Sequence, residues 1–158
     1  MVKRVMIGND HGGYDTKIEL VKHLSAKGIE VINAGSDSTE IVRYPLYARK
    51  VAGAVARGEV ERGILICSTG IGMSIAANKI KGIRASVCTS HYMAMMTRQH
   101  NDSNVLCLGG KITGIFEIFD IVGAWLENNY IGDRHAISLK LISDMEDELG
   151  LKVPALYP

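Results

Sequence analysis

The sequence predicts an α/β protein with a three-layer, Rossmann-like fold, in which a five-stranded parallel sheet is flanked by helices on both faces. Short apolar runs alternate five times with longer segments whose apolar residues recur at helical spacing. Residues 63–67 (GILIC) are continuously apolar, as expected for a parallel strand buried on both faces. The 158 residues contain no repeat or linker, so residues 1–149 are predicted to form one domain and 150–158 an extended tail.

The first strand is predicted at residues 5–7, an apolar run that ends at Gly8. Residues 14–27 follow as a helix, because their apolar positions recur at helical spacing until Gly28 ends the pattern. Residues 29–32 are the second strand. These segments make the first strand–helix–strand unit of the sheet.

The next unit begins with a polar loop over residues 34–44, after which Pro45 opens a helix that ends at Gly58. The third strand, at 63–67, leads through a glycine-containing turn into a helix that extends through Lys79. Right-handed crossovers between parallel strands place such helices on the faces of the sheet.

The C-terminal half predicts two more strands, at 83–88 and 104–108, and two more helices, at 91–100 and 113–128. A last helix is marked by apolar residues at steps of four, namely Ile137, Leu141, Met145 and Leu149. Its apolar stripe comes after the fifth strand, so this helix is a candidate contact with a second subunit.

The composition limits the functional classes. The net charge of +1 with mixed signs argues against binding to a nucleic-acid backbone, and the 6% aromatic content argues against base stacking. The apolar stretch at the N-terminus is too short for a signal peptide or a membrane span. Three cysteines without CxxC spacing argue against a zinc ribbon or a disulfide framework. We therefore expect a cytoplasmic protein that binds neither nucleic acid nor a membrane.

Ligands of such folds bind beyond the carboxyl ends of the strands, where the strand order reverses. The turn at residues 68–72 (STGIG) follows the third strand, and its glycines let the backbone approach a ligand while the N–H groups of the next helix favour an anion. A tight turn without a ligand is the alternative. The turn lacks the Lys of a Walker loop, and Ile75 stands where a dinucleotide fingerprint has its third Gly, so nucleotide binding is disfavoured.

Three side chains at strand ends are candidates for chemistry. Cys67 lies just before a helix N-terminus, where a thiolate is stabilised; the alternative is a small buried hydrophobe, which fits Cys88 and Cys107 well. Asp10 and His11 follow the first strand, where a carboxylate and an imidazole are costly in a core and useful at a site. A solvated loop pair is the alternative for these two.

Two further groups come from helix ends. His100 and Asn101 end the fourth helix, where a histidine interacts with the helix dipole, and we also expect this end to point toward the ligand edge of the sheet. Arg134 lies near the start of the last helix, where a cation is unexpected, so either a bound anion or simple exposure explains it. The sequence has no His-x-x-x-His pattern or acidic cluster, so no metal is predicted.

Several motifs together resemble one family. They are GNDHGG at 8–13, YP at 44–45, GILICSTGIG at 63–72, SIAANK at 74–79, GIRA at 82–85, RQHND at 98–102 and RH at 134–135. The sequence is thereby similar to the type B ribose-5-phosphate isomerases, a family that includes galactose-6-phosphate and allose-6-phosphate isomerases, over residues 3–149. The resemblance implies aldose–ketose isomerisation of a sugar phosphate through a cis-enediolate, without metal or cofactor. It also implies a homodimer or dimer of dimers whose subunits share the active site.

The resemblance implies roles for individual residues. In the catalytic set, Cys67 would be the base for the C2 proton and Thr69 would move the proton between the oxygens. His100 would open the furanose ring, with Asp10 assisting at the ring oxygen and hydroxyls. The substrate-binding set would comprise an anion hole (Ser68, Gly70, Ile71, Gly72), phosphate ligands (His11, Arg134), sugar-positioning groups (Tyr44, Asn101) and two further positions (Lys111, Ser138).

Three positions depart from the family pattern. Ser68 replaces a usual Gly, Lys111 stands where many members have Arg, and Ser138 stands where many have a second phosphate-binding Arg. Because Arg grips phosphate bidentately and Lys acts as a point charge, the reaction type is better defined than the substrate. The first hypothesis is interconversion of ribose 5-phosphate and ribulose 5-phosphate. The alternatives are allose or galactose 6-phosphate, a tetrose phosphate, an unphosphorylated sugar, a non-catalytic sugar-phosphate-binding module, or a flavodoxin-like or nucleotide-binding domain.

Overall fold

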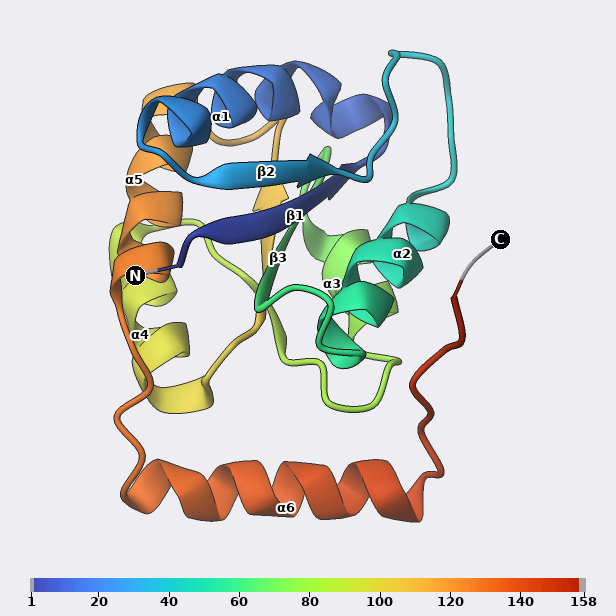
Figure 1. Ribbon diagram of the computed structural model, residues 1–158, viewed down its shortest axis with the longest axis vertical. Helices are drawn as coiled ribbons and strands as arrows, with labels where there is room; N and C mark the ends of the chain where they lie inside the picture. Colours follow the sequence, from blue (N-terminus) through green and yellow to red (C-terminus); the bar gives the residue numbers. More distant parts are fainter. Residues whose placement is uncertain (1, 157–158) are drawn as a thin grey trace.

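The computed structural model describes residues 2–156 and places five strands in one sheet (Figure 1). The strands are β1 (Arg4–Asn9), β2 (Glu30–Asn33), β3 (Arg62–Cys67), β4 (Ala85–Val87) and β5 (Val105–Gly109). The helices are the short 3₁₀ helix η1 (His11–Gly13), α1 (Tyr14–Ala26), α2 (Tyr44–Ala56), α3 (Ile71–Ala77), α4 (His91–Asn101), α5 (Ile115–Glu127) and α6 (Arg134–Glu148). Neighbouring strands pair in parallel in the order β2-β1-β3-β5-β4, so the predicted sheet is confirmed.

Helices cover both faces of the sheet, and each face has its own apolar core (Figure 1). Successive side chains of β3 point to opposite faces: Ile64 and Ile66 enter the core under α1, α4 and α5, while Leu65 and Cys67 enter the core under α2 and α3. Every residue of β3 is buried, as its continuous apolar run predicts. Removing this apolar surface from water is the main stabilising contribution to the fold.

Local signals in the sequence set several helix ends. Gly28 and Gly58 both have φ of +75° and lie two residues after the last residues of α1 and α2, in the left-handed conformation that ends a helix. Pro45 lies in the first turn of α2, where its missing N–H costs nothing. At the start of α4, the Ser90 hydroxyl accepts a hydrogen bond from the Met93 N–H at 3.3 Å.

Some element bounds differ from those predicted. Helix α3 ends at Ala77 and not at Lys79, because the Asn78 side chain turns to bond both backbone groups of Ala85: its Oδ1 accepts from the N–H at 2.8 Å and its Nδ2 donates to the C=O at 2.9 Å. Helix α6 begins at Arg134, ahead of its apolar stripe. The turn η1 was not predicted, since only three residues form it.

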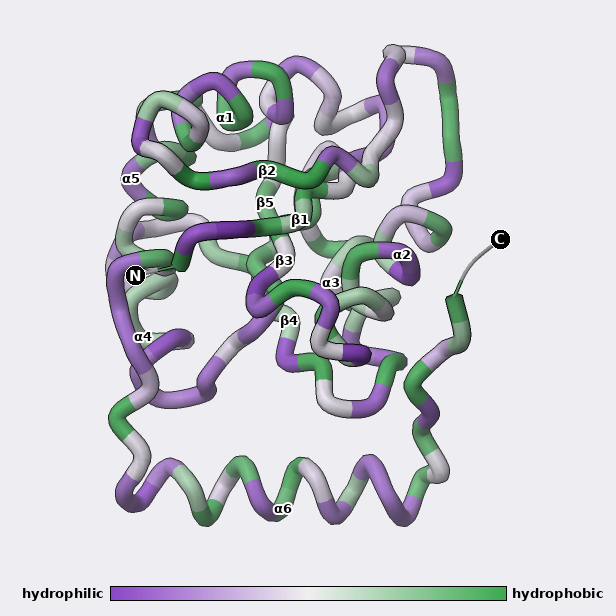
Figure 2. The backbone as a smooth tube through the Cα atoms, in the orientation of Figure 1, coloured by the Kyte–Doolittle hydropathy of each residue, from purple (hydrophilic) through white to green (hydrophobic). Residues whose placement is uncertain are grey.

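Helix α6 lies apart from the sheet and from the helices that cover its two faces, and it buries none of its residues (Figure 1). Green apolar and purple polar positions alternate along it in Figure 2; its large exposed apolar side chains are Ile137, Leu141, Ile142 and Met145, and Leu149 follows directly after the helix. Residues 151–156 follow without helix or strand and return along α2, where the Pro154 C=O accepts from Arg57 Nη1 at 2.9 Å. A helix with an exposed apolar stripe is typical of a surface that a partner covers. Within residues 2–156, no helix is long and apolar enough to cross a membrane.

Candidate active site

The strand order reverses between β1 and β3, because the chain goes from β1 to β2 on one side and to β3 on the other. Asn9 pairs with Ile66 in the register of these two strands, so the residues that follow, Asp10 and Cys67, emerge side by side at the carboxyl edge. The Asp10 N–H donates to the Ile66 C=O at 3.2 Å and continues the ladder to this point. This is the place where ligands of open parallel sheets bind.

Asp10 is only 6% exposed, although it carries a carboxylate. Its Oδ1 accepts a hydrogen bond from the Gly12 N–H at 2.8 Å, which caps η1 and fixes the carboxylate at the edge of the sheet. An ideal Cβ on Gly12 would lie 2.3 Å from Ser68 Oγ, so only glycine lets the loop after β1 lie this close to the loop after β3. The two loops therefore form one surface.

His11 is oriented by the long loop that follows β2. The Val42 N–H donates to His11 Nδ1 at 3.3 Å, so the proton of a neutral imidazole lies on Nε2. His11 can therefore donate from Nε2 to a ligand. Sequence analysis did not identify Val42, because a backbone N–H leaves no signature in a residue pattern.

A buried lysine holds the same loop. Lys17 of α1 is 1% exposed, and its Nζ donates to the Ser36 C=O and to Asp37 Oδ1, both at 2.7 Å. Hydrogen bonds from Lys17 and from Asn33 lower the pKa of the Asp37 carboxyl. The sequence gives no signal of this contact, because Lys17 falls in a helical pattern where a lysine is normally solvated.

Cys67 ends β3 and is 6% exposed. Its Sγ accepts a hydrogen bond from the Gly70 N–H at 3.1 Å, a contact that stabilises negative charge on sulfur. The other two thiols lie deeper: burial raises the pKa of Cys88 to about 12, and burial raises the pKa of Cys107 above its usual range as well. Of the three cysteines, Cys67 is therefore the one that is placed to react.

The turn at 68–72 depends on Gly70, which has φ of +78° and faces the Leu108 backbone. A Cβ there would lie 3.0–3.1 Å from Leu108 backbone atoms, so both the conformation and the space require glycine. The Thr69 hydroxyl accepts from the Ile71 N–H at 3.4 Å. The N–H groups in the first turn of α3 point toward this edge, as at the start of any helix.

Tyr44 and Lys111 also lie beside the loops that follow β1 and β3. The Tyr44 ring packs against Gly72, where a Cβ would lie 2.8 Å from the ring. The Lys111 N–H donates to the Ser68 C=O at 3.1 Å, while its exposed ammonium lies 3.8 Å from Asp15 Oδ2. The structure thus brings together ten of the predicted residues, called here the strand-end group: Asp10, His11, Tyr44, Cys67, Ser68, Thr69, Gly70, Ile71, Gly72 and Lys111.

The other four predicted residues lie at the opposite edge of the sheet and are called here the α4–α6 group: His100, Asn101, Arg134 and Ser138. Helix α4 returns from the carboxyl end of β4 to the start of β5, so His100 lies near the amino ends of the strands. The expectation that this helix end points toward the ligand edge of its own chain is wrong. Across the six residues of β3 the two edges are roughly 17 Å apart. His100 and Cys67 of one chain cannot act on the same sugar.

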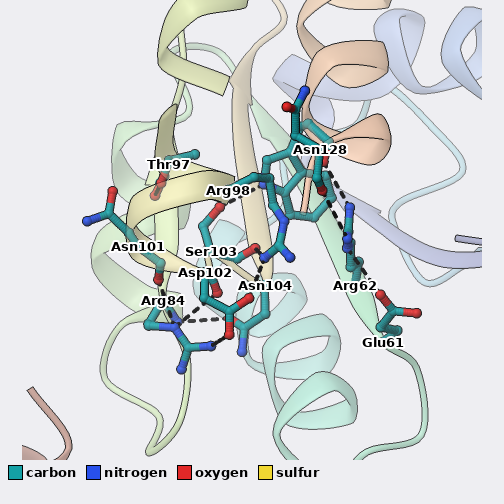
Figure 3. A network of polar contacts seen from close by, with 12 residues as sticks. Glu61, Arg62, Arg84, Thr97, Arg98, Asn101, Asp102, Ser103, Asn104 and Asn128 are labelled. Atoms are coloured by element: carbon teal, nitrogen blue, oxygen red, sulfur yellow. Dashed lines mark hydrogen bonds and ion pairs between the residues drawn. The ribbon is translucent and has the colours of Figure 1, made fainter. Parts of the chain in front are cut away.

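A polar network fixes the end of α4 (Figure 3). Asp102, with φ of +46°, accepts from Arg98 Nη1 at 2.9 Å and from Arg84 Nη2 at 2.8 Å. Arg62, at the start of β3, donates from Nη1 to the Trp125 C=O at 2.8 Å; burial, and then the nearby Arg98, lower the pKa of Arg62 to about 10. The Asn101 amide points away from this network in Figure 3. The turn that carries His100 and Asn101 is therefore held rigidly.

The strand-end group includes groups that suit proton transfer, namely a carboxylate, an imidazole, a thiol and hydroxyls, together with the Lys111 ammonium. Within the part of the chain that the structure describes, no three His, Cys, Asp or Glu side chains are grouped so as to hold a metal ion. Proton transfer at a strand edge needs a base within hydrogen-bond reach and donors for the developing negative charge. Cys67 and the neighbouring N–H groups are the candidates for these two roles.

Comparison with known proteins identifies the relatives of this chain. The model of the ribose/galactose isomerase family matches residues 5–142. Ribose-5-phosphate isomerase B of Escherichia coli is 50% identical over 145 residues, which are 92% of this chain and 97% of that protein. D-erythrulose-4-phosphate isomerase of Pectobacterium atrosepticum is 37% identical over 145 residues, 91% of this chain and 95% of that protein. The structure of Clostridium thermocellum ribose-5-phosphate isomerase B superposes with a TM-score of 0.91 at 49% identity, covering 92% of this chain and 99% of that one.

Proposed function

This chain belongs to the ribose/galactose isomerase family and is an aldose–ketose isomerase, and from that premise we propose that it interconverts ribose 5-phosphate and ribulose 5-phosphate. The 50% identity to a ribose-5-phosphate isomerase B supports this substrate pair. A non-catalytic binding module and a nucleotide-binding domain, both open from the residues alone, are set aside by these relatives.

The observation that carries the proposal is the position of Cys67, which follows the last β1–β3 pair next to Asp10 in register and whose Sγ accepts a hydrogen bond from the Gly70 N–H at 3.1 Å. As a thiolate, Cys67 takes the proton from C2 of the open-chain aldose and returns it to C1. The electron pair of the broken C–H bond forms the C1–C2 double bond of a cis-enediolate. The Thr69 hydroxyl both donates and accepts, so it moves the proton between the two enediolate oxygens. The N–H groups of residues 68–72 other than those of Gly70 and Ile71, which donate to Cys67 and Thr69, stabilise the developing oxyanion.

The phosphate and the sugar hydroxyls need further groups. His11 donates from Nε2, because Val42 occupies its Nδ1, and Lys111 adds a positive charge at the same edge. Tyr44, which packs on Gly72, and Ser68 bound the space available to the sugar. Asp10 is placed to bond the ring oxygen or a hydroxyl group of the sugar.

Ring opening requires a second chain. We assign it to His100, with Arg134 on the phosphate and Asn101 on a hydroxyl, yet these side chains lie at the far edge of their own sheet. Two chains that pack with opposite orientation bring the α4–α6 group of one onto the strand-end group of the other. The exposed apolar stripe of α6 supports such packing. The proposed assembly is a homodimer, or a dimer of dimers, with shared active sites.

A different sugar phosphate is the second candidate. The 37% identical relative is named for D-erythrulose 4-phosphate, so substrates differ among relatives of this chain. Compared with the glycine usual in the family, Ser68 narrows the space for the sugar or adds a hydroxyl beside it. Ser138 lacks the positive charge that an arginine would supply to the phosphate. Both changes lie where the substrate would be bound, not where the proton is moved.

A substrate panel separates the candidates. We expect kcat/KM for ribose 5-phosphate to exceed that for allose 6-phosphate, galactose 6-phosphate, erythrulose 4-phosphate and free ribose by about tenfold or more, because buried polar groups left unpaired by a wrong sugar are costly. Initial rates on each sugar measure this. An equal or greater kcat/KM on another member of the panel would overturn the ribose assignment.

A further inference from the structure

We propose that His135 is a positioning residue that holds the His100 imidazole in the orientation needed for ring opening. The inference rests on the proposed function, because it takes His100 as the ring-opening group. The two imidazoles stack face to face, with ring centroids 4.1 Å apart and planes 9° from parallel. His100 comes from the last turn of α4 and His135 from the first turn of α6, so the stack joins two separate elements.

The stack orients His100 where other contacts do not. Within residues 2–156, no hydrogen bond is made to either ring nitrogen of His100, whose backbone is fixed by the Asp102 network. A flat partner on one face restricts rotation of the ring about its own side-chain bonds and leaves both nitrogens accessible at the rim. An imidazole that must give a proton to one sugar oxygen needs its orientation fixed in this way.

Charge favours a division of roles within the stack. Partial burial, then the neighbouring His100 and Arg134, lower the pKa of His135, and Asp133 opposes them. Two stacked imidazolium ions would repel at this distance. The lowered pKa favours a neutral His135 as the flat partner of the His100 ring.

The position of His135 in the sequence couples two parts of the site. Arg134, proposed to bind the phosphate, is the preceding residue on α6. One helix start therefore sets both the phosphate contact and the orientation of the ring-opening group. A substrate held by its phosphate then meets His100 in a fixed geometry.

The test separates ring opening from the proton transfer at carbon. Ribose 5-phosphate is a furanose and must open, whereas ribulose 5-phosphate is open-chain, because its C5 oxygen carries the phosphate. Exchange of the C1 proton of ribulose 5-phosphate with D₂O needs the thiol but no ring opening. We expect His135→Ala to lower kcat on ribose 5-phosphate roughly tenfold while slowing C1 exchange less than about twofold, as expected for a misoriented acid–base group.

His135→Phe tests whether the flat ring of His135, and not one of its nitrogens, orients His100, since phenylalanine keeps a flat ring and removes both nitrogens. We expect it to restore most of the rate that His135→Ala loses. A matched control is His23→Ala, which removes another stacked imidazole, 3.9 Å from Phe119 on α5, and should change neither rate.

Unchanged rates in His135→Ala, equal losses in both assays, or a loss in His135→Phe as large as in His135→Ala would each overturn the proposal. These outcomes differ from failure of the proposed function, in which the unaltered protein itself would not isomerise ribose 5-phosphate.

Discussion

Replacing Cys67 with Ala is expected to lower kcat on ribose 5-phosphate by about a thousandfold or more, because the variant lacks the proposed base for the C2 proton. The thiol lies at the reversal point of the strand order and accepts the Gly70 N–H at 3.1 Å. Since the side chain is small, its loss should leave the binding of the substrate nearly unchanged. Steady-state kinetics and C1 exchange of ribulose 5-phosphate should both show the loss.

Cys88→Ala is the matched control for this experiment. Cys88 is buried against the core under α4, and burial raises the pKa of its thiol to about 12, so it should not act as a base at neutral pH. We expect this variant to retain activity. If Cys67→Ala kept more than about a tenth of the rate, the base would have to be a different group, and the mechanism proposed here would be wrong.

Replacing His100 with Ala is expected to lower kcat on ribose 5-phosphate by about a hundredfold or more, the usual contribution of a general acid–base group. The furanose then opens only by its slow uncatalysed reaction. C1 exchange of ribulose 5-phosphate, which involves no ring, should remain within about twofold of the unaltered protein, since the base is untouched. This split distinguishes His100 from Cys67, whose loss affects both assays.

His91→Ala controls for the loss of a histidine from the same helix. His91 lies at the opposite end of α4, where its Nδ1 is 3.0 Å from Asp120 Oδ1 on the exposed surface. We expect neither assay to change in this variant. A His100→Ala variant that slowed both assays equally would place His100 in substrate binding or proton transfer at carbon and would contradict a role confined to ring opening.

The sheet and the strand-end group could be predicted from the sequence because both depend on short-range patterns. A continuously apolar run such as 63–67 predicts a strand buried on both faces, and all six residues of β3 are buried. The residues that follow such strands must gather at one edge, so the sequence alone predicts that Asp10 and Cys67 lie together, as the strand register confirms. Gly70 likewise marks a tight turn, and its φ of +78° requires glycine.

The predicted position of His100 is wrong for a topological reason. A helix that connects two parallel strands runs back across the sheet, so its end lies at the edge opposite the preceding strand's end. Applied to residues 91–101, this rule alone would have placed His100 away from Cys67. The resemblance groups both residues in one site, and the proposed pairing of two chains is the arrangement that would reconcile this grouping with the topology.

Other contacts could not be predicted, because they depend on partners that are distant in the sequence. The Val42 N–H that orients His11 is a backbone group, and the buried Lys17 is recognised only by its contacts with Ser36 and Asp37. The stack of His135 on His100 likewise depends on how α6 meets α4. Such contacts set the orientation of groups whose identity the motifs predict.

The central claim is that each active site combines Cys67 of one chain with His100 of another, and mixing two inactive variants tests it most directly. Cys67→Ala and His100→Ala subunits are co-expressed or refolded together, and isomerisation of ribose 5-phosphate is measured. Half of randomly formed dimers are mixed, and one of their two sites has both groups, so activity should return to about a quarter of the unaltered protein. Activity that stays at the average of the two separate variants would contradict a shared site.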